Sequence, residues 1–114
     1  MTAYKLLRLR SDGSLGSLFV GRQEVIIPGV TYKARSDLPH PGLAHRPGFH
    51  CTSGMSAPHL KMRLRSGEVR VWCRVEIARS SIRHERPQSQ GGLWWTSPWM
   101  RVTEIMKDDV VIPD

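Results

Sequence analysis

The sequence predicts an α+β fold that is mostly antiparallel β-sheet with one or two short helices, and three observations predict it. The segment VRVWCRVEI, residues 69–77, alternates strictly between apolar and polar side chains, which is typical of a β-strand. Several other short apolar runs are separated by Gly, Pro and Ser turns. The segment that begins at Ser56 has a Ser in an N-cap position and a Pro two residues later, as short helices often do.

The remaining elements are expected in a simple order within one domain that covers residues 1–114. The helix that begins at Ser56 should end at Ser66-Gly67, and residues 37–48 and 78–92 are expected to be loops because turn-forming or polar residues dominate them. Strands are predicted where a short apolar run is bounded by turn residues, which applies to residues 4–10, 17–20, 24–34, 49–53, 100–106 and 110–112.

The charge balance predicts an anionic partner. The chain has 17 Lys and Arg residues against 10 Asp and Glu, a formal net charge of +7, and most of the basic residues are Arg. Arginine makes two-pronged contacts with phosphate and carboxylate groups. The excess is concentrated between Lys61 and Arg86, so nucleic acid, a nucleotide or an acidic host protein are the expected partners, against the alternative of a merely solvated surface. The candidate partner contacts are Arg63, Arg65 and Trp95, since partly exposed Trp anchors interfaces and stacks on bases.

A membrane partner is not expected. No apolar run approaches the roughly 20 residues that a membrane-spanning helix requires. The first residues alternate charge with Leu, unlike a secretory signal. We therefore expect a cytoplasmic protein whose cysteines are reduced, with Cys73 as a small core residue of the strand at residues 69–77.

The segment HRPGFHCTSGMSAPHL, residues 45–60, gathers three histidines, one cysteine and a Thr-Ser pair. A metal is not expected there, because the spacing matches no standard zinc pattern and because adjacent His50 and Cys51 would point to opposite faces of an extended segment. A cysteine hydrolase would use Cys51 as nucleophile and His59 or His84 as base, but no motif connects these residues.

The order of the elements resembles the ADP-ribosyltransferase fold. The resemblance is carried by Arg8 on the first strand, by the run GFHCTS at residues 48–53, by the short helix after it and by the strand at residues 69–77. It implies an NAD-type pocket in which Arg8, His50 and Thr52 serve catalysis. The cofactor contacts that it implies are Phe49, Arg46, Gln90 and Trp94.

The chain departs from that family in its late segment, which lacks a Glu-x-Glu or Gln-x-Glu pair and offers only Gln88-Ser89-Gln90. Among the remaining acids, Glu104 would be either a buried acid with a raised pKa or an edge residue. Without a carboxylate at the pocket, the fold would bind a nucleotide or a protein and catalyse nothing.

Independently, the chain resembles a group of short proteins encoded by phages and prophages over nearly its full length. That resemblance implies an accessory role in the host cytoplasm, such as modifying or inhibiting a host or defence component. Three functions stay open: an ADP-ribosyltransferase-like protein, a non-enzymatic basic protein that docks on nucleic acid or on an acidic host protein, or a structural component of a phage particle, which only this resemblance favours. The segments that carry the resemblance are YKLLRLRSDGSLGSLFV, RPGFHCTS, APHL, VRVWCRVEI and RPQSQGGLWW.

Overall fold

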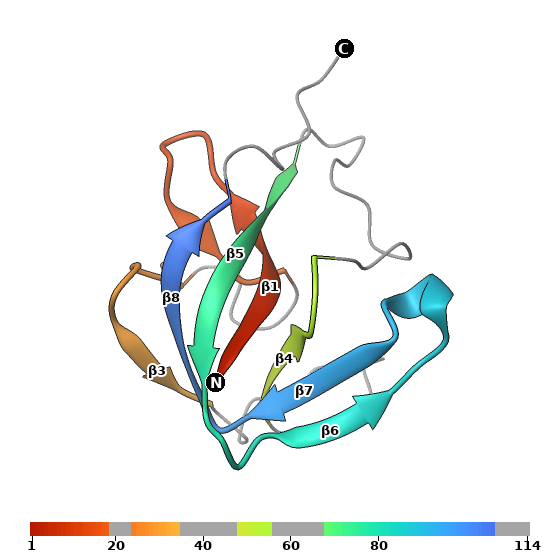
Figure 1. The fold of residues 1–114 in the computed structure, drawn as a ribbon. Coiled ribbons are helices and arrows are strands. Elements are labelled where there is room, and N and C mark those ends of the chain that lie inside the picture. Colours follow the sequence, from red (N-terminus) through yellow and green to blue (C-terminus); the bar gives the residue numbers. More distant parts are fainter. Residues whose placement is uncertain (19–23, 35–47, 56–67, 107–114) are drawn as a thin grey trace.

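The computed structural model describes residues 1–18, 24–34, 48–55 and 68–106. These residues form almost entirely antiparallel β-structure (Figure 1). The 3-10 turn η1 (Gln88–Gln90) is the only helical segment among them. The strands are β1 (Thr2–Leu9), β2 (Leu15–Gly16), β3 (Thr31–Lys33), β4 (Phe49–Thr52), β5 (Val69–Ile77), β6 (Ile82–Glu85), β7 (Leu93–Ser97) and β8 (Trp99–Ile105).

The two longest strands, β1 and β5, form the centre of the sheet. They pair without a shift from Thr2 opposite Glu76 to Leu9 opposite Val69. The strand order is β3-β8-β5-β1-β4-β7-β6, with β2 paired to β1 beside this path. Strand β3 therefore lies at one end of the order and β6 at the other.

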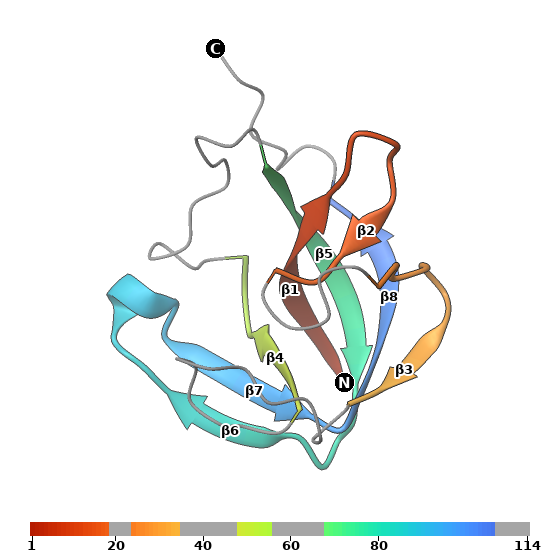
Figure 2. The same cartoon turned by 180° about the vertical axis from the view of Figure 1, so that it is seen from behind.

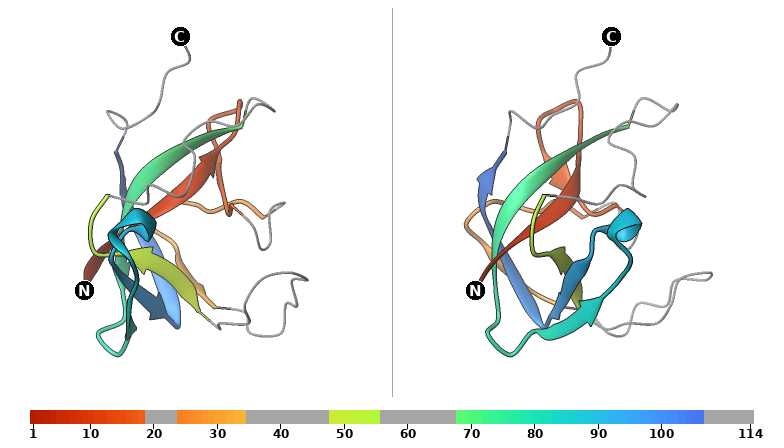
Figure 3. Two further views of the ribbon diagram at one scale, coloured as in Figure 1. Left: turned by 90° about the vertical axis from the view of Figure 1, so that its right-hand side faces the viewer. Right: turned by 45° about the vertical axis from the view of Figure 1, so that its right-hand side comes forward.

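The far edge of β1 is shared by two different strands, and Figures 2 and 3 show the resulting two arms on either side of it. Near the start of β1, Tyr4 pairs with Thr52 of β4, and near its end Leu9 pairs with Leu15 of β2. Strand β4 continues into β7 and β6. After β2, the chain turns so that Ile26 bridges to Leu15, and β3 then pairs with β8. The arm that contains β2, Ile26 and β3 thus starts at β1 and ends at β8 of the same sheet.

The apolar side chains of β5 face the main core, as their alternation predicts. Four of them are completely enclosed, and residues of β1, β4 and β8 pack against them. Cys73 is among the four, which confirms its prediction as a core residue. The buried members of this inner core from β1, β4, β5 and β8 are Ala3, Leu7, Cys51, Val71, Cys73, Val75, Ile77, Met100 and Val102.

The opposite face of β1 and β5 carries a smaller apolar cluster. Leu6 and Trp72 are directly paired across the two strands and pack with Leu18. Trp72 and the nearby Arg70 are both buried. The central pair of strands is therefore enclosed on both faces around Leu6 and Trp72, whereas Arg74 and Glu76 of β5 are partly exposed on the second face. We call the face that bears Trp72 the outer face.

The predicted α+β fold class is wrong, and so is the ADP-ribosyltransferase-like arrangement that it included. The described residues form a small domain of antiparallel strands with the order given above. The prediction missed β6 because residues 82–85 are mostly polar, and an edge strand tolerates charged side chains that an interior strand does not. The helix predicted from Ser56 lies outside the described residues.

Several strand predictions are confirmed. The strand predicted at residues 69–77 has those bounds in the structure. The strands predicted at residues 4–10, 49–53 and 100–106 are present to within two residues at each end. Period-two alternation and turn residues therefore located the central strands correctly.

We predict that Ile77→Ala lowers the free energy of unfolding by about 2–5 kcal/mol, because it removes buried methyl groups and leaves a cavity in the inner core. Ile77 is completely buried, whereas Ile82 is 63% exposed on β6. The matched substitution Ile82→Ala should therefore cost less than about 1 kcal/mol. Urea unfolding followed by Trp fluorescence measures both losses. Equal losses would contradict the placement of the inner core.

Candidate functional site

The three side chains predicted to serve catalysis lie at positions on the outer face of the sheet. His50 and Thr52 are alternate residues of β4, and Thr52 is placed beside β1 by its pairing with Tyr4. Arg8 is four residues beyond Tyr4 along β1, which separates these two residues by about 13 Å at the usual rise of a strand. The structure therefore puts the three on one face, with Arg8 toward the far end of β1.

Thr52 is tied into the fold. The residue is 1% exposed, and its Oγ1 lies 2.6 Å from the carbonyl oxygen of Gly54 and 3.2 Å from that of Tyr4. A hydroxyl carries one proton, so it donates to one of these carbonyls at a time. These contacts hold the end of β4 against β1, which is a structural role.

Arg8 belongs to a compact ion network. It lies directly opposite Arg70, and the carboxylate of Glu68 lies 3.9 Å from Nη1 of Arg8 and 3.3 Å from Nε of Arg70. Like charges that face each other across strands are destabilising, and the shared carboxylate offsets that repulsion. The side chains of Arg70 and Glu68 are only 6% and 8% exposed. The network therefore belongs to the interior of the domain.

Two predicted cofactor contacts hold the connection between β6 and β7. Nε1 of Trp94 donates a hydrogen bond of 2.6 Å to the carbonyl oxygen of Gln90, which fixes η1 against β7. The guanidinium carbon of Arg86 lies 5.9 Å from the centroid of the Trp94 ring, within the range of a cation–π contact. Trp94 also packs against the outer apolar cluster.

The other predicted contacts divide between the inner core and the undescribed segments. Phe49 and Trp95 both pack against the inner core while remaining partly exposed, and Trp95 lies opposite the buried Cys51. They are thus on the face opposite to Arg8 and Trp94, so the aromatic residues expected at one pocket are separated by the sheet. Arg46, Arg63 and Arg65 lie outside the described residues.

The inner face of β1 places a lysine between two thiols. Lys5 lies opposite Cys73 of β5, and the register of β1 with β4 sets Cys51 on its other side. Nζ of Lys5 donates a hydrogen bond of 2.7 Å to the carbonyl oxygen of His50. Burial lowers the pKa of Lys5, with a smaller opposing effect from Cys51. Burial also raises the pKa of Cys51, and raises that of Cys73 to about 12.

These thiols are therefore protonated near neutral pH and poorly nucleophilic. Because β1 separates them, their Cα atoms are about 9–10 Å apart, two strand spacings. A disulfide needs Cα atoms within about 7 Å, so the two free cysteines cannot pair without moving β1. The proposed base His84 contacts Oγ1 of Thr96 at 3.0 Å on the outer face, away from Cys51. His59 lies outside the described residues.

Of the two alternatives predicted for Glu104, a buried acid or an edge residue, the structure shows the edge residue. Its side chain is 51% exposed and forms an ion pair with Arg74, directly opposite on β5. The carboxylate is therefore solvated and paired.

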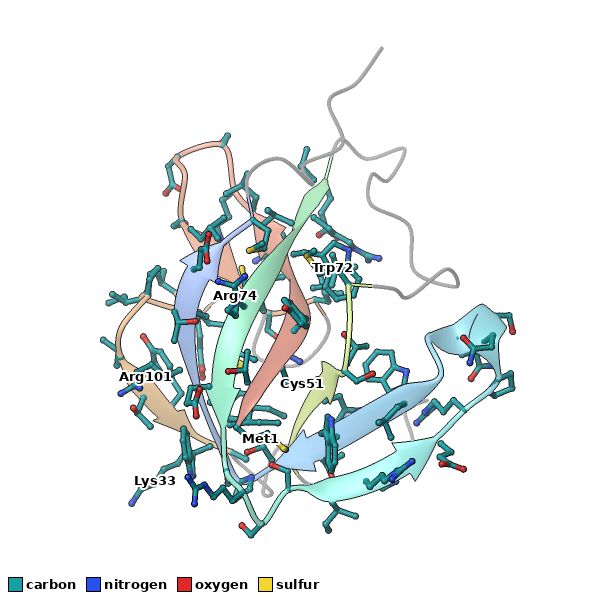
Figure 4. The ribbon with its side chains drawn as sticks, viewed as in Figure 1. Met1, Lys33, Cys51, Trp72, Arg74 and Arg101 are labelled. Carbon is teal, nitrogen blue, oxygen red and sulfur yellow. The ribbon has the colours of Figure 1, made fainter. Side chains whose placement is uncertain are left out.

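The best candidate for a functional site lies where β3 pairs with β8. Lys33 faces Trp99 and Thr31 faces Arg101 across the two strands. Figure 4 labels Lys33 and Arg101 at this side of the domain. A shallow depression here, which we call the edge groove, is largely open to solvent, and its lining is more apolar than polar. The residues that line it are Thr31, Lys33, Ala34, Pro98, Trp99 and Arg101.

Local hydrogen bonds position the edge groove. Oγ of Ser97 accepts from the backbone N–H of Ala78 at 3.1 Å and donates to the carbonyl oxygen of Trp99 at 2.6 Å, which fixes the start of β8. On β3, Oη of Tyr32 accepts from the backbone N–H of Ile27 at 2.9 Å while its ring packs against the inner core. Since side chains alternate along a strand, the neighbours of Tyr32 point outward into the groove.

The edge groove is electropositive. Lys33 and Arg101 are exposed, and neither side chain forms a hydrogen bond or an ion pair with any of the described residues. The carboxylate of Glu76 lies opposite Arg101 on β5. It is already held by the Met1 ammonium at 2.5 Å. This hydrogen bond, the Met1 charge, Thr2 and, to a smaller extent, Arg101 lower the pKa of Glu76.

Lys33, Arg101 and Trp99 were not among the site residues predicted from the sequence. The three residues lie on strands more than 60 positions apart, so only the pairing of β3 with β8 brings them together. A weak signal exists in the alternation of each strand, TYK and WMR, which puts Tyr32 and Met100 on the inner face and the basic residues outside.

Comparison of the chain with protein-family models, curated proteins and solved structures finds no match. The described residues include no helix with the length and hydropathy that a membrane crossing requires. Within the same residues, no group of three or more His, Cys, Asp or Glu side chains is placed to hold a metal ion. His45 and His59 lie outside these residues.

We predict that Lys5 makes stability rise with pH in the alkaline range. Its pKa lies below the ordinary 10.5, so the unfolded chain binds more protons between these two values, and the free energy of unfolding rises with pH across that window. Each unit of depression corresponds to about 1.4 kcal/mol. Urea unfolding of the wild type and of Lys5→Met measures the free energy of unfolding from pH 7 to 10.5. The value for the wild type should rise relative to that of the variant as pH increases. A difference that does not change with pH would contradict the burial of this ammonium group.

Proposed function

We propose that the protein is a non-enzymatic nucleic-acid-binding protein and that the edge groove is its contact surface. The observation that carries the proposal is the arrangement of two exposed cations, Lys33 and Arg101, around the partly exposed Trp99 on one face of the sheet. Phosphates supply the negative charge that such cations bind, and bases supply a flat surface on which an indole stacks.

The shape of the groove favours a polymer over a small molecule. Pockets for small ligands enclose most of the ligand surface, whereas the edge groove is shallow and largely open. A chain that lies across such a surface makes many weak contacts and needs no enclosure. The net charge of +7 adds long-range attraction toward a polyanion.

Further positive charge lies at the same end of the sheet. Arg79 is exposed in the turn after β5, directly after Ala78, whose backbone N–H contacts Ser97 at the start of β8. A bound strand that leaves the groove toward this turn would meet another cation.

The described residues favour binding over catalysis. The thiols of Cys51 and Cys73 are buried and protonated, and the hydroxyl of Thr52 is engaged with backbone carbonyls. The NAD pocket was implied by a fold resemblance whose α+β class is wrong for the described residues, and the pocket itself stays a prediction. The phage setting and the inhibition of a host component stay predictions.

An acidic protein surface is the alternative partner, because carboxylates would also satisfy Lys33 and Arg101. The partly exposed indole between these cations favours nucleic acid, since stacking on aromatic rings is a general mode of base recognition. Poly-glutamate is a probe for the alternative. Binding to poly-glutamate without binding to nucleic acid would reject the proposal.

We predict that Arg101→Gln weakens binding to a 20-nucleotide strand and reduces the slope of log K against log salt by about one, since one phosphate contact is lost. Fluorescence anisotropy of a labelled oligonucleotide between 25 and 300 mM NaCl measures both quantities.

Arg83→Gln is the matched control, because it removes the same charge from β6, where Arg83 is paired with Glu85 at 2.9 Å. It should change affinity less than twofold. Equal effects of the two substitutions would show that only net charge matters and would reject the groove as the site. Absence of binding by the wild type at 25 mM NaCl would reject the function itself.

A further inference from the structure

We infer that the edge groove selects single-stranded over double-stranded nucleic acid, with Trp99 stacked on one unpaired base and with Lys33 and Arg101 bound to the flanking phosphates. The inference rests on the proposed function and adds the class of nucleic acid and the role of each side chain.

The placement of the cations around the indole fits a strand with one exposed base. Lys33 is directly opposite Trp99, and such paired side chains have Cβ atoms about 5 Å apart. Arg101 is two residues further along β8 on the same face, about 7 Å away. The two cations thus lie in different directions from the ring, one across the sheet and one along it. A backbone that passes the ring can therefore meet a positive charge on each side of the stacked base.

The lining of the groove discriminates against a duplex. Three of its lining residues, Ala34, Pro98 and Trp99, are apolar or aromatic. A duplex keeps the faces of its bases stacked inside and presents phosphates and groove edges. Such a surface gains little binding free energy from apolar lining residues, whereas an unpaired base can bury its face against them.

Hydrogen bonds at the start of β8 fix the backbone from which the Trp99 indole projects. The backbone of Trp99 is fixed on both its N–H and its carbonyl oxygen by Oγ of Ser97, at 3.3 and 2.6 Å. Pro98, directly before Trp99, has its own φ fixed by its ring. A side chain that projects from a fixed backbone loses less conformational entropy on binding than one on a mobile segment.

The test compares two substitutions at Trp99 with two probes. Trp99→Leu keeps an apolar side chain and removes the aromatic face, whereas Trp99→Phe keeps a smaller aromatic face. The probes are a 12-nucleotide oligo-dT strand and a 12-base-pair duplex, measured by fluorescence anisotropy at 50 mM NaCl. Thermal melting of each variant checks that the domain is folded.

Stacking of one base on an aromatic side chain is worth about 5- to 150-fold in affinity. We expect Trp99→Leu to weaken oligo-dT binding within that range and to change duplex binding less than twofold, with Trp99→Phe recovering most of the loss. The wild type should bind the single strand more tightly than the duplex. Equal affinity for both probes, or equal losses on both probes in Trp99→Leu, would overturn the selectivity while leaving the nucleic-acid function standing. No binding to either probe would remove both.

A second measurement uses the wild-type protein and does not depend on the folding of a variant. An oligo-dT strand that carries one 5-iododeoxyuridine, a base that crosslinks to adjacent aromatic side chains under ultraviolet light, is irradiated in the complex. Trp94, Trp95 and Trp99 lie in one tryptic peptide, so fragment-ion sequencing of that peptide by mass spectrometry should locate the crosslink on Trp99 itself. A crosslink confined to other aromatic residues would overturn the stacking role of Trp99.

Discussion

The pairing of β1 with β5 is the constraint on which the rest of the structure depends. Their two faces differ in chemistry: the inner face is an apolar core, and the outer face carries the buried Trp72 and the network of Arg8, Glu68 and Arg70. A slip of one residue would turn every side chain of a strand to the other face. Such a slip would place guanidinium groups in the inner core and expose valines. The register is therefore strongly specified, because a slipped strand would remove charged groups from water and expose apolar side chains to it.

The edge groove follows from this pairing in two steps. Strand β5 fixes β8, and β8 fixes the short β3, which contributes Lys33. The register of β5 with β8 shifts between Arg74 and Val75, so one extra residue of β8 is accommodated there and the strand can bend. The basic and aromatic surface is thus held by a strand that is itself anchored in the core.

The central strands were predictable from sequence, and the site was not. Residues 69–77 alternate so regularly that their bounds and inner face follow from the pattern alone. Strand β6 was missed because its polar composition gives no apolar period. The resemblance to a known fold failed because the order of local elements does not determine which strands pair. The edge groove combines Lys33 with Trp99 through a long-range contact, and short-range patterns do not report such contacts.

The position of β1 in the centre of the sheet also affects how the domain can form during translation. Its first residues emerge from the ribosome early, yet Tyr4 pairs with Thr52, 48 residues later, and Thr2 pairs with Glu76, 74 residues later. Until then the nascent chain can offer β1 only the adjacent hairpin partner β2. The apolar strand β1 therefore keeps one open side until β4 and β5 have been synthesised. Co-translational folding of this domain is expected to be late and nearly all-or-none, and its slow step to be the docking of β5 onto a long-exposed β1.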